Sequence, residues 1–298
     1  MGIDKLLLVH KGAVGDFFLA WPAFWALSRH YPQSELLWCG KQEFLPWLQP
    51  LGFAACPRRM HLLVDKLYSS PDLPGELGNV RIFWFGVRQR TICARGPGIS
   101  FLKAVPGGQT MHVREAYQKQ LSREGIDWPR DWKAAWGCFF GEREKSEWDV
   151  LVFPGSGNSA KNWPGVKFFE LARRLEKRGK KVCFVPGPVE KEMGFGLPDA
   201  EVCCPRDLFE LAGLIRRSKA VVGNDCGPMH LAGNFSVPGV ELFGPTHSGR
   251  WLAEGMRAVS SPLDCSPCSL TARVDCISPG CMEKIEVRRV LAELTSVF

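Results

Sequence analysis

The sequence predicts an α/β protein made of two domains of similar size. Short apolar, β-branched runs alternate with longer segments of helical periodicity along the 298 residues, a pattern typical of parallel sheets covered by helices. This length suits one large or two mid-sized domains, each with its own core. The polar stretch at residues 141–147 precedes a new strand, so we place the boundary there, giving domains 1–144 and 145–298.

Composition excludes several classes of protein. With 45% hydrophobic and 23% charged residues, the chain resembles an ordinary soluble globular protein. No apolar run reaches the roughly 18 residues of a membrane span, and we expect no signal peptide. The net charge of +7 comes with no nucleic-acid-binding motif, so we expect no nucleic acid partner. The basic clusters at 173–178 and 216–217 are either solvated helix faces or contacts to anionic lipid headgroups.

The first domain begins with a strand at residues 5–10. A glycine-containing loop follows, and then a helix from about 17 to 31, where Pro22 implies a kink or a late start. Asp16 lies at the carboxyl end of the strand, where it either caps the helix or presents an exposed carboxylate. Further strands are expected at 35–39 and 80–85, and further helices at 43–51 and 112–124.

A basic, glycine-rich region lies between the strand expected at 80–85 and the helix expected at 112–124. Arg88, Arg90 and Arg95 lie in it, with glycines at 96, 98, 107 and 108. We interpret it either as a surface loop or as a rim that binds an acidic sugar or phosphate.

The second domain opens with a strand at 149–153, a Gly/Ser loop at 154–164 and a helix that ends near Arg178. Such a loop between strand and helix favours phosphate, and Lys161 adds positive charge. By itself the signal is weak, because the loop is neither a Walker loop nor G-x-G-x-x-G. A strand at 181–185 and a helix at 208–217 follow.

The most informative stretch is residues 220–247. We expect a buried strand at 220–223, a loop at 224–228, a helix at 229–235 that starts with Pro228, and a strand at 239–243. The helix start leaves backbone N–H groups free at the carboxyl end of a parallel strand, and these groups and the helix dipole both favour a diphosphate.

Three stretches of the sequence resemble the signatures of one enzyme family in order and spacing. They are Gly15-Asp16-x5-Pro22-Ala23, the run from Pro154 through Lys161-x-Trp163-Pro164, and Asp225-x-Gly227-x-x-His230-x-x-Gly233 followed by Phe243-Gly244-Pro245-Thr246. The family is glycosyltransferase family 9, the ADP-heptose:lipopolysaccharide heptosyltransferases. The run Lys11–Val14 differs from the Arg-x-Ser/Gly-Ala-Leu type of run found in many members. This difference affects the contacts expected next to the aspartate and leaves the aspartate itself matched.

The resemblance implies a GT-B fold, with two Rossmann-like domains that face a central cleft. It assigns acceptor binding to residues 1–144 and nucleotide-sugar binding to residues 145–298. It makes Asp16 the catalytic base and Lys161 the residue that stabilises the leaving diphosphate. The donor-binding residues that it implies are Ser156, Gly157, Lys161, Glu190, Asp225, Cys226, Gly227 and His230. Glu192 competes with Glu190 for the contact to the ribose hydroxyls.

The activity implied is an inverting, metal-independent transfer of a heptose from an ADP-sugar donor to a lipopolysaccharide inner-core or related glycan, without a cofactor. The acceptor would be lipid-linked or an oligosaccharide, and the enzyme cytoplasmic, peripheral at the inner face of the inner membrane. Alternatives are another nucleotide-sugar donor, a non-catalytic paralogue that binds sugar nucleotides, and a nicotinamide-dependent oxidoreductase. The last lacks its fingerprint, since no G-x-G-x-x-G follows the first strand.

Four cysteines near the C-terminus have spacings compatible with a metal site: Cys265, Cys268, Cys276 and Cys281. Zinc or an Fe–S cluster is one interpretation, and four reduced thiols in an irregular lobe is the other. Cysteines occur along the whole chain, which fits a reducing cytosol better than a disulfide scaffold.

Overall fold

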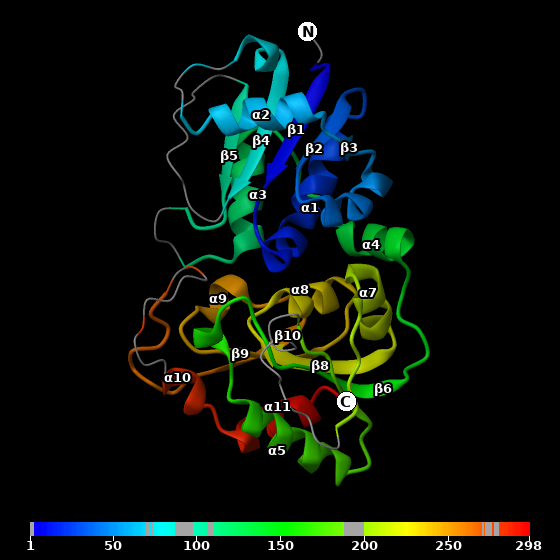
Figure 1. The fold of residues 1–298 in the computed structure, drawn as a ribbon, viewed down its shortest axis with the longest axis vertical. Helices are drawn as coiled ribbons and strands as arrows, with labels where there is room; N and C mark the ends of the chain where they lie inside the picture. Colours follow the sequence, from blue (N-terminus) through cyan, green and yellow to red (C-terminus); the bar gives the residue numbers. More distant parts are fainter. Residues whose placement is uncertain are drawn as a thin grey trace. The chain divides into compact units, whose positions relative to one another are not determined.

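The computed structural model describes residues 3–69, 72, 74–86, 98–106, 110–187, 200–269, 271, 276 and 280–298. The chain divides into two compact units, Met1–Trp132 and Lys133–Phe298, which Figure 1 shows in blue to green and green to red. This division lies before the boundary that we expected after residue 144. Most of helix α4 (Trp132–Phe140) belongs to the second unit, because Trp136 packs edge-to-face on Phe235.

The first unit contains a parallel sheet of five strands in the order β3-β2-β1-β4-β5. The strands are β1 (Lys5–His10), β2 (Glu35–Gly40), β3 (Ala54–Ala55), β4 (Val80–Gly86) and β5 (Ile99–Lys103). Strands β2 and β3 are added on one side of β1, and the chain then crosses back so that β4 pairs with the other side of β1 and β5 with β4. The strand order therefore reverses between β1 and β4, the position where ligands bind in open α/β sheets.

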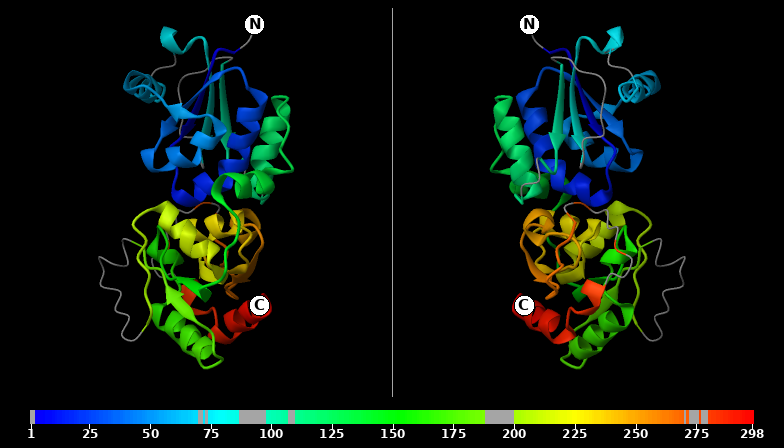
Figure 2. Two further views of the ribbon diagram at one scale, coloured as in Figure 1. Left: turned by 90° about the vertical axis from the view of Figure 1, so that its right-hand side faces the viewer. Right: turned by 90° about the vertical axis from the view of Figure 1, so that its left-hand side faces the viewer.

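Helices cover both faces of this sheet: α1 (Val14–His30), α2 (Arg58–Lys66) and α3 (Val113–Arg123). Figure 2 shows α2 on one side of the sheet, with α1 and α3 together on the other. The side under α2 holds an apolar cluster drawn from α2 and from strands β1, β2 and β4. Apolar residues on alternate positions of the strands thus supply both faces with a core.

Two expectations for the first unit need correction. Residues 43–51 do not form one α-helix but two short 3-10 segments, Gln42–Trp47 and Gln49–Leu51, because Pro46 and Pro50 cannot donate α-helical hydrogen bonds. The helix expected from residue 17 begins at Val14 and continues through Pro22, so there is no late start. A third 3-10 segment, Gly75–Leu77, precedes β4.

The second unit contains another five-stranded parallel sheet, in the order β10-β9-β8-β6-β7. Its strands are β6 (Trp148–Phe153), β7 (Val182–Phe184), β8 (Ser218–Asn224), β9 (Gly239–Phe243) and β10 (Met256–Ser260). Strand β8 pairs with β6 instead of with β7, its predecessor in the described chain. The strand order reverses between β6 and β8, so this sheet has its own ligand-binding position.

The helices of the second unit are α5 (Gly165–Glu176), α7 (Leu208–Arg216), α8 (Gly227–Asn234), α9 (Ser248–Trp251), α10 (Gly280–Glu283) and α11 (Val287–Thr295), with a 3-10 turn at Ser159–Lys161. Apolar residues of α5 and α11 pack with those of β6, β8 and β9 in one continuous core. In the described part of the chain, no helix combines the length and apolar character that crossing a bilayer requires.

Candidate active site

Two loops lie together where the second sheet reverses its strand order. One follows β6 at residues 154–158 and the other follows β8 at residues 225–226, and the strand ends Phe153 and Gly223 are register partners. A Cβ atom added at Gly223 would come within 2.9 Å of Cβ of Phe153, so this close approach requires glycine. Both loops that the sequence singled out as anion sites therefore meet at one edge of one sheet.

Asn224 ties the two loops together. Its Nδ2 donates to the carbonyl oxygen of Pro154 at 2.7 Å, and its Oδ1 accepts from the backbone N–H of Trp163 at 2.8 Å. The side chain is fully buried, where hydrogen bonds of this kind are costly to lose. The Gly/Ser loop is thus held at both ends by one residue of the neighbouring strand.

Lys161 and Asp225 form a buried ion pair at the same edge. The Lys161 ammonium donates to the backbone carbonyl of Asp225 at 2.8 Å and to its Oδ2 at 3.1 Å, and both side chains are only 8% exposed. The hydroxyl of Thr246 donates to the same Oδ2 at 2.8 Å. Among the described residues, these contacts engage two of the three ammonium hydrogens, which leaves one for an incoming anion.

Two further titratable groups complete this cluster. His230 on α8 and Glu241 on β9 place ligand-type atoms within 4.8 Å of those of Asp225. Burial and the charge of Asp225 raise the pKa of Glu241 well above its ordinary value. Its Oε2 accepts from the backbone N–H of Ala253 at 2.7 Å. The carboxylate that pairs with Lys161 is that of Asp225, while Glu241 lies buried behind it.

The start of α8 and the loop after β6 provide donors for an anion. Cys226 is the N-cap of α8. Pro228 in the first turn has no N–H, and the N–H of Met229 donates to the carbonyl oxygen of Cys226 at 3.2 Å. The N–H groups of Cys226 and Gly227 therefore remain as the donors that the described start of α8 offers to an anion. Ser156 donates its hydroxyl to Oδ1 of Asn162 at 2.7 Å, which fixes the turn of the Gly/Ser loop. Gly157 has open space around the position of a Cβ atom.

Asp16 belongs to the first unit. It lies in the first turn of α1, beyond the carboxyl end of β1, and its side chain is half-buried. Its Oδ2 accepts from the backbone N–H of Ala13 at 3.1 Å, so the carboxylate serves the helix start and also faces outward in part. A Cβ atom at Gly12 would lie 2.9 Å from this oxygen, which explains the glycine.

His10 stands behind Asp16 in the core. It is packed among the rings of Phe17, Phe24, Trp38 and Phe44. Burial lowers the pKa of His10 to about 4, opposed by a hydrogen bond to the backbone of Asp16. The imidazole is therefore neutral at physiological pH and braces the turn that carries the aspartate.

We expect His10 to make folding sensitive to acid. Between the unfolded pKa of 6.5 and the folded pKa of about 4, only the unfolded state binds the proton, so stability is lost as the pH falls, by about 3 kcal/mol in all. His10→Leu removes this contribution. Between about pH 7.5 and pH 4 the melting temperature of the parent should therefore fall more steeply than that of the variant, and parallel profiles would contradict the assignment.

The remaining expected site residues stand as follows. Glu190 and its competitor Glu192 lie outside the described residues, as do Arg88, Arg90 and Arg95. Cys265, Cys268 and Cys276 are exposed, and Cys281 is buried on α10. In the described part of the chain, no three of these sulfurs come within 4.8 Å of one another.

The structure adds residues to the site that the sequence analysis did not single out. Asn224 and Glu241 contribute through contacts with segments that are distant in sequence. Thr246, the last residue of the third signature, takes a specific role as the donor to Asp225. Glu241 had one visible signal, since a carboxylate within a buried apolar strand needs a polar partner. His10 had a similar signal at the end of β1.

Comparison with known proteins assigns the chain to a family. The model for glycosyltransferase family 9 (heptosyltransferase) matches residues 115–276, more than half of the chain. Lipopolysaccharide heptosyltransferase 1 of Pseudomonas aeruginosa is 36% identical over 181 residues, 56% of this chain and 50% of that protein. Lipopolysaccharide heptosyltransferase 2 of Escherichia coli is 26% identical over 293 residues, 81% of this chain and 83% of that protein.

Solved structures share the fold. E. coli heptosyltransferase WaaC with ADP superposes with a TM-score of 0.69 at 16% identity, covering 99% of this chain and 100% of that one. TibC from enterotoxigenic E. coli, an iron-containing dodecameric glycosyltransferase, gives 0.57 at 15% identity, covering 100% and 76%. At these identities the likeness concerns the fold alone, and it confirms the expected GT-B class with two Rossmann-like domains.

Proposed function

The chain belongs to glycosyltransferase family 9 and is a heptosyltransferase-like glycosyltransferase of lipopolysaccharide synthesis; from this premise we propose that it transfers a heptose or a related sugar from an ADP-sugar to an inner-core or related glycan. The observation that carries the donor site is the meeting of the Gly/Ser loop, Lys161 and the start of α8 at the point where the second sheet reverses its strand order. Diphosphates bind at such points.

An adenosine diphosphate donor fits the comparisons as well as the site. E. coli heptosyltransferase WaaC, which shares the fold, was solved with ADP and with ADP-2-deoxy-2-fluoro heptose. We therefore assign the second unit to the donor and the first unit, with Asp16, to the acceptor. Ser156, Gly157, Cys226 and Gly227 would contact the diphosphate, and Glu190 the ribose.

The chemistry we propose is a single displacement. The carboxylate of Asp16 takes the proton from an acceptor hydroxyl, whose oxygen attacks the anomeric carbon on the face opposite the diphosphate. The bond from that carbon to the diphosphate oxygen breaks, and ADP leaves with the electron pair, so the configuration at the anomeric carbon inverts. The ammonium of Lys161 and the N–H groups at the start of α8 stabilise the negative charge on the leaving group.

Lys161 also supports a reaction without a metal ion. Its ammonium is fixed on Asp225 at the position where the diphosphate would meet positive charge. His230 and Glu241 then brace Asp225 and the loop. The basic surface at 173–178 is suited to a peripheral contact with anionic lipid, which would place the enzyme at the cytoplasmic face of the inner membrane beside a lipid-linked acceptor. Arg216 and Arg217 are instead engaged by Glu144 and Glu147.

A direct assay tests this function. The purified chain is incubated with ADP-heptose and, in parallel, with UDP- and GDP-sugars, with lipopolysaccharide truncated in the inner core as acceptor. We expect release of ADP, an acceptor heavier by one heptose and inversion at the anomeric carbon by NMR, with EDTA leaving the rate unchanged. Turnover of a UDP- or GDP-sugar alone would overturn the donor assignment, and donor binding without product would indicate a non-catalytic paralogue.

A further inference from the structure

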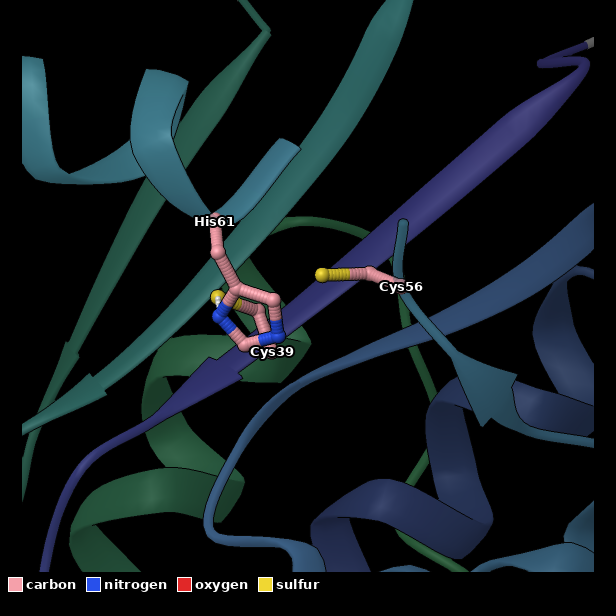
Figure 3. A group of neighbouring side chains, drawn as sticks. All are labelled: Cys39, Cys56 and His61. Carbon is pink, nitrogen blue, oxygen red and sulfur yellow. Dashed lines mark hydrogen bonds between the residues drawn. The ribbon is translucent and has the colours of Figure 1, made fainter. Parts of the chain in front are cut away.

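Two cysteines and a histidine converge on one face of the first sheet, away from the residues assigned to catalysis. Cys39, Cys56 and His61 place their sulfur and ring nitrogen atoms within 4.8 Å of one another, and Figure 3 shows the sulfur of Cys39 beside the ring of His61 and the side chain of Cys56 pointing toward that ring. Sγ of Cys39 lies 3.2 Å from Nδ1 of His61. Each of these residue types is a ligand for borderline and soft metal ions.

The fold brings the three together from separate elements. Cys39 is on β2, and Cys56 follows β3, where its N–H donates to the carbonyl oxygen of Trp38 at 3.0 Å. Because Trp38 and Ala55 are register partners, Cys39 and Cys56 occupy adjacent positions on the same side of the sheet. His61 is on α2, which packs over that side.

The environment suits one metal ion of charge +2. Cys39 is fully buried and Cys56 is 5% exposed, while His61 is half-buried and gives access from solvent. Two thiolates and a neutral imidazole would cancel the charge of the ion, so the complex would add no net charge to the apolar core. Tetrahedral zinc, with bonds of about 2.3 Å to sulfur and about 2.0 Å to nitrogen, needs its ligand atoms roughly 3.5 to 3.8 Å apart. The observed separations are 3.2 Å between Sγ of Cys39 and Nδ1 of His61 and at most 4.8 Å between the other ligand atoms. They lie on either side of the required values, so small movements of the side chains would admit the ion.

We propose that Cys39, Cys56 and His61 bind a zinc ion, with the fourth position open to solvent. The ion joins β2, the segment after β3 and helix α2, and it adds to the apolar packing between them on this side of the sheet. The site is therefore structural: it stabilises the first unit and takes no part in transfer. Its principal rival is a disulfide, because both thiols are free in this structure and their sulfur atoms lie within 4.8 Å of one another.

Metal binding by the full chain tests the proposal without reference to activity. The protein is stripped with a chelator under reducing conditions and titrated with zinc and, separately, with cobalt(II). We expect a melting temperature that rises with zinc and, with cobalt, the near-ultraviolet charge-transfer band of thiolate ligation. Cys56→Ser and His61→Gln should each weaken binding at least about tenfold, and Cys138→Ser, an exposed thiol on α4, should bind like the parent.

The tail cysteines are a second source of thiolates, so the titrations are repeated in a chain carrying Cys265→Ser and Cys268→Ser. Zinc and the cobalt band should persist there, and their loss would move the site to the tail and overturn the proposal. Equal affinities for zinc in the parent and in both ligand variants would also overturn it. So would a thiol titration that finds two fewer free thiols before reduction than after it, because that result would show a disulfide. Because the cobalt spectrum of the parent is itself diagnostic, a variant that folds poorly leaves the test intact.

Discussion

Asp16→Asn is expected to abolish most of the transferase activity, with kcat reduced by about 10²- to 10⁴-fold, the range for loss of a general base. The amide oxygen of asparagine can still accept the hydrogen bond from Ala13 that the carboxylate accepts at 3.1 Å. The start of α1 should therefore be kept while basicity is lost. Product formation under saturating donor and acceptor measures the effect, together with the melting temperature and the affinity for ADP.

A matched control is available on the same unit. Asp131 is an exposed aspartate that pairs with Arg29, and surface pairs of this kind contribute little. Asp131→Asn should turn over like the parent. If Asp16→Asn retains full kcat while it folds normally, the proton is taken by another group and the mechanism proposed for this residue fails.

Lys161→Met is expected to lower both turnover and stability. Methionine keeps much of the shape of the side chain but removes the positive charge that stabilises the leaving diphosphate. We therefore expect kcat to fall by about 10²- to 10³-fold. It also leaves the carboxylate of Asp225 buried without its cation, which costs about 3–5 kcal/mol. The thermal midpoint and kcat of the single variant measure the two losses together.

A double variant separates the two losses. In Lys161→Met with Asp225→Asn, the amide at 225 carries no charge and can still accept from Thr246, which donates to Oδ2 in the parent. We expect most of the stability to return while the rate stays low. Recovery of both would show that Lys161 acts through folding alone, and recovery of neither would show that the carboxylate of Asp225 has its own role.

Much of this fold was predictable because the periodicity of the sequence is local. Strands such as β6 and β8 are continuous apolar runs, and the glycine-rich loops after them mark the carboxyl edge of the sheet. The sequence analysis missed strands β3, β5 and β10 and helices α2, α4, α9, α10 and α11. Strand β5 has only five residues with a serine and a lysine among them, and α2 is polar on most of its surface, so neither has the apolar content that identifies an element by pattern.

The sequence predicted individual residues of the candidate site but not the contacts between them. The sequence indicated Lys161 and Asp225 as members of two loops, but their ion pair depends on β8 lying beside β6. That neighbourhood is a property of topology, which no spacing in the sequence encodes. The same holds for Cys39, Cys56 and His61. Their proximity depends on the register of β2 with β3 and on the packing of α2 over these strands.

The bridge made by Asn224 has a consequence for how a nucleotide sugar arrives. Its buried amide hydrogen-bonds to Pro154 and to Trp163, so the Gly/Ser loop is fixed at both ends by contacts within the protein itself. This loop therefore loses little conformational entropy when a donor binds, which favours tight capture of the diphosphate.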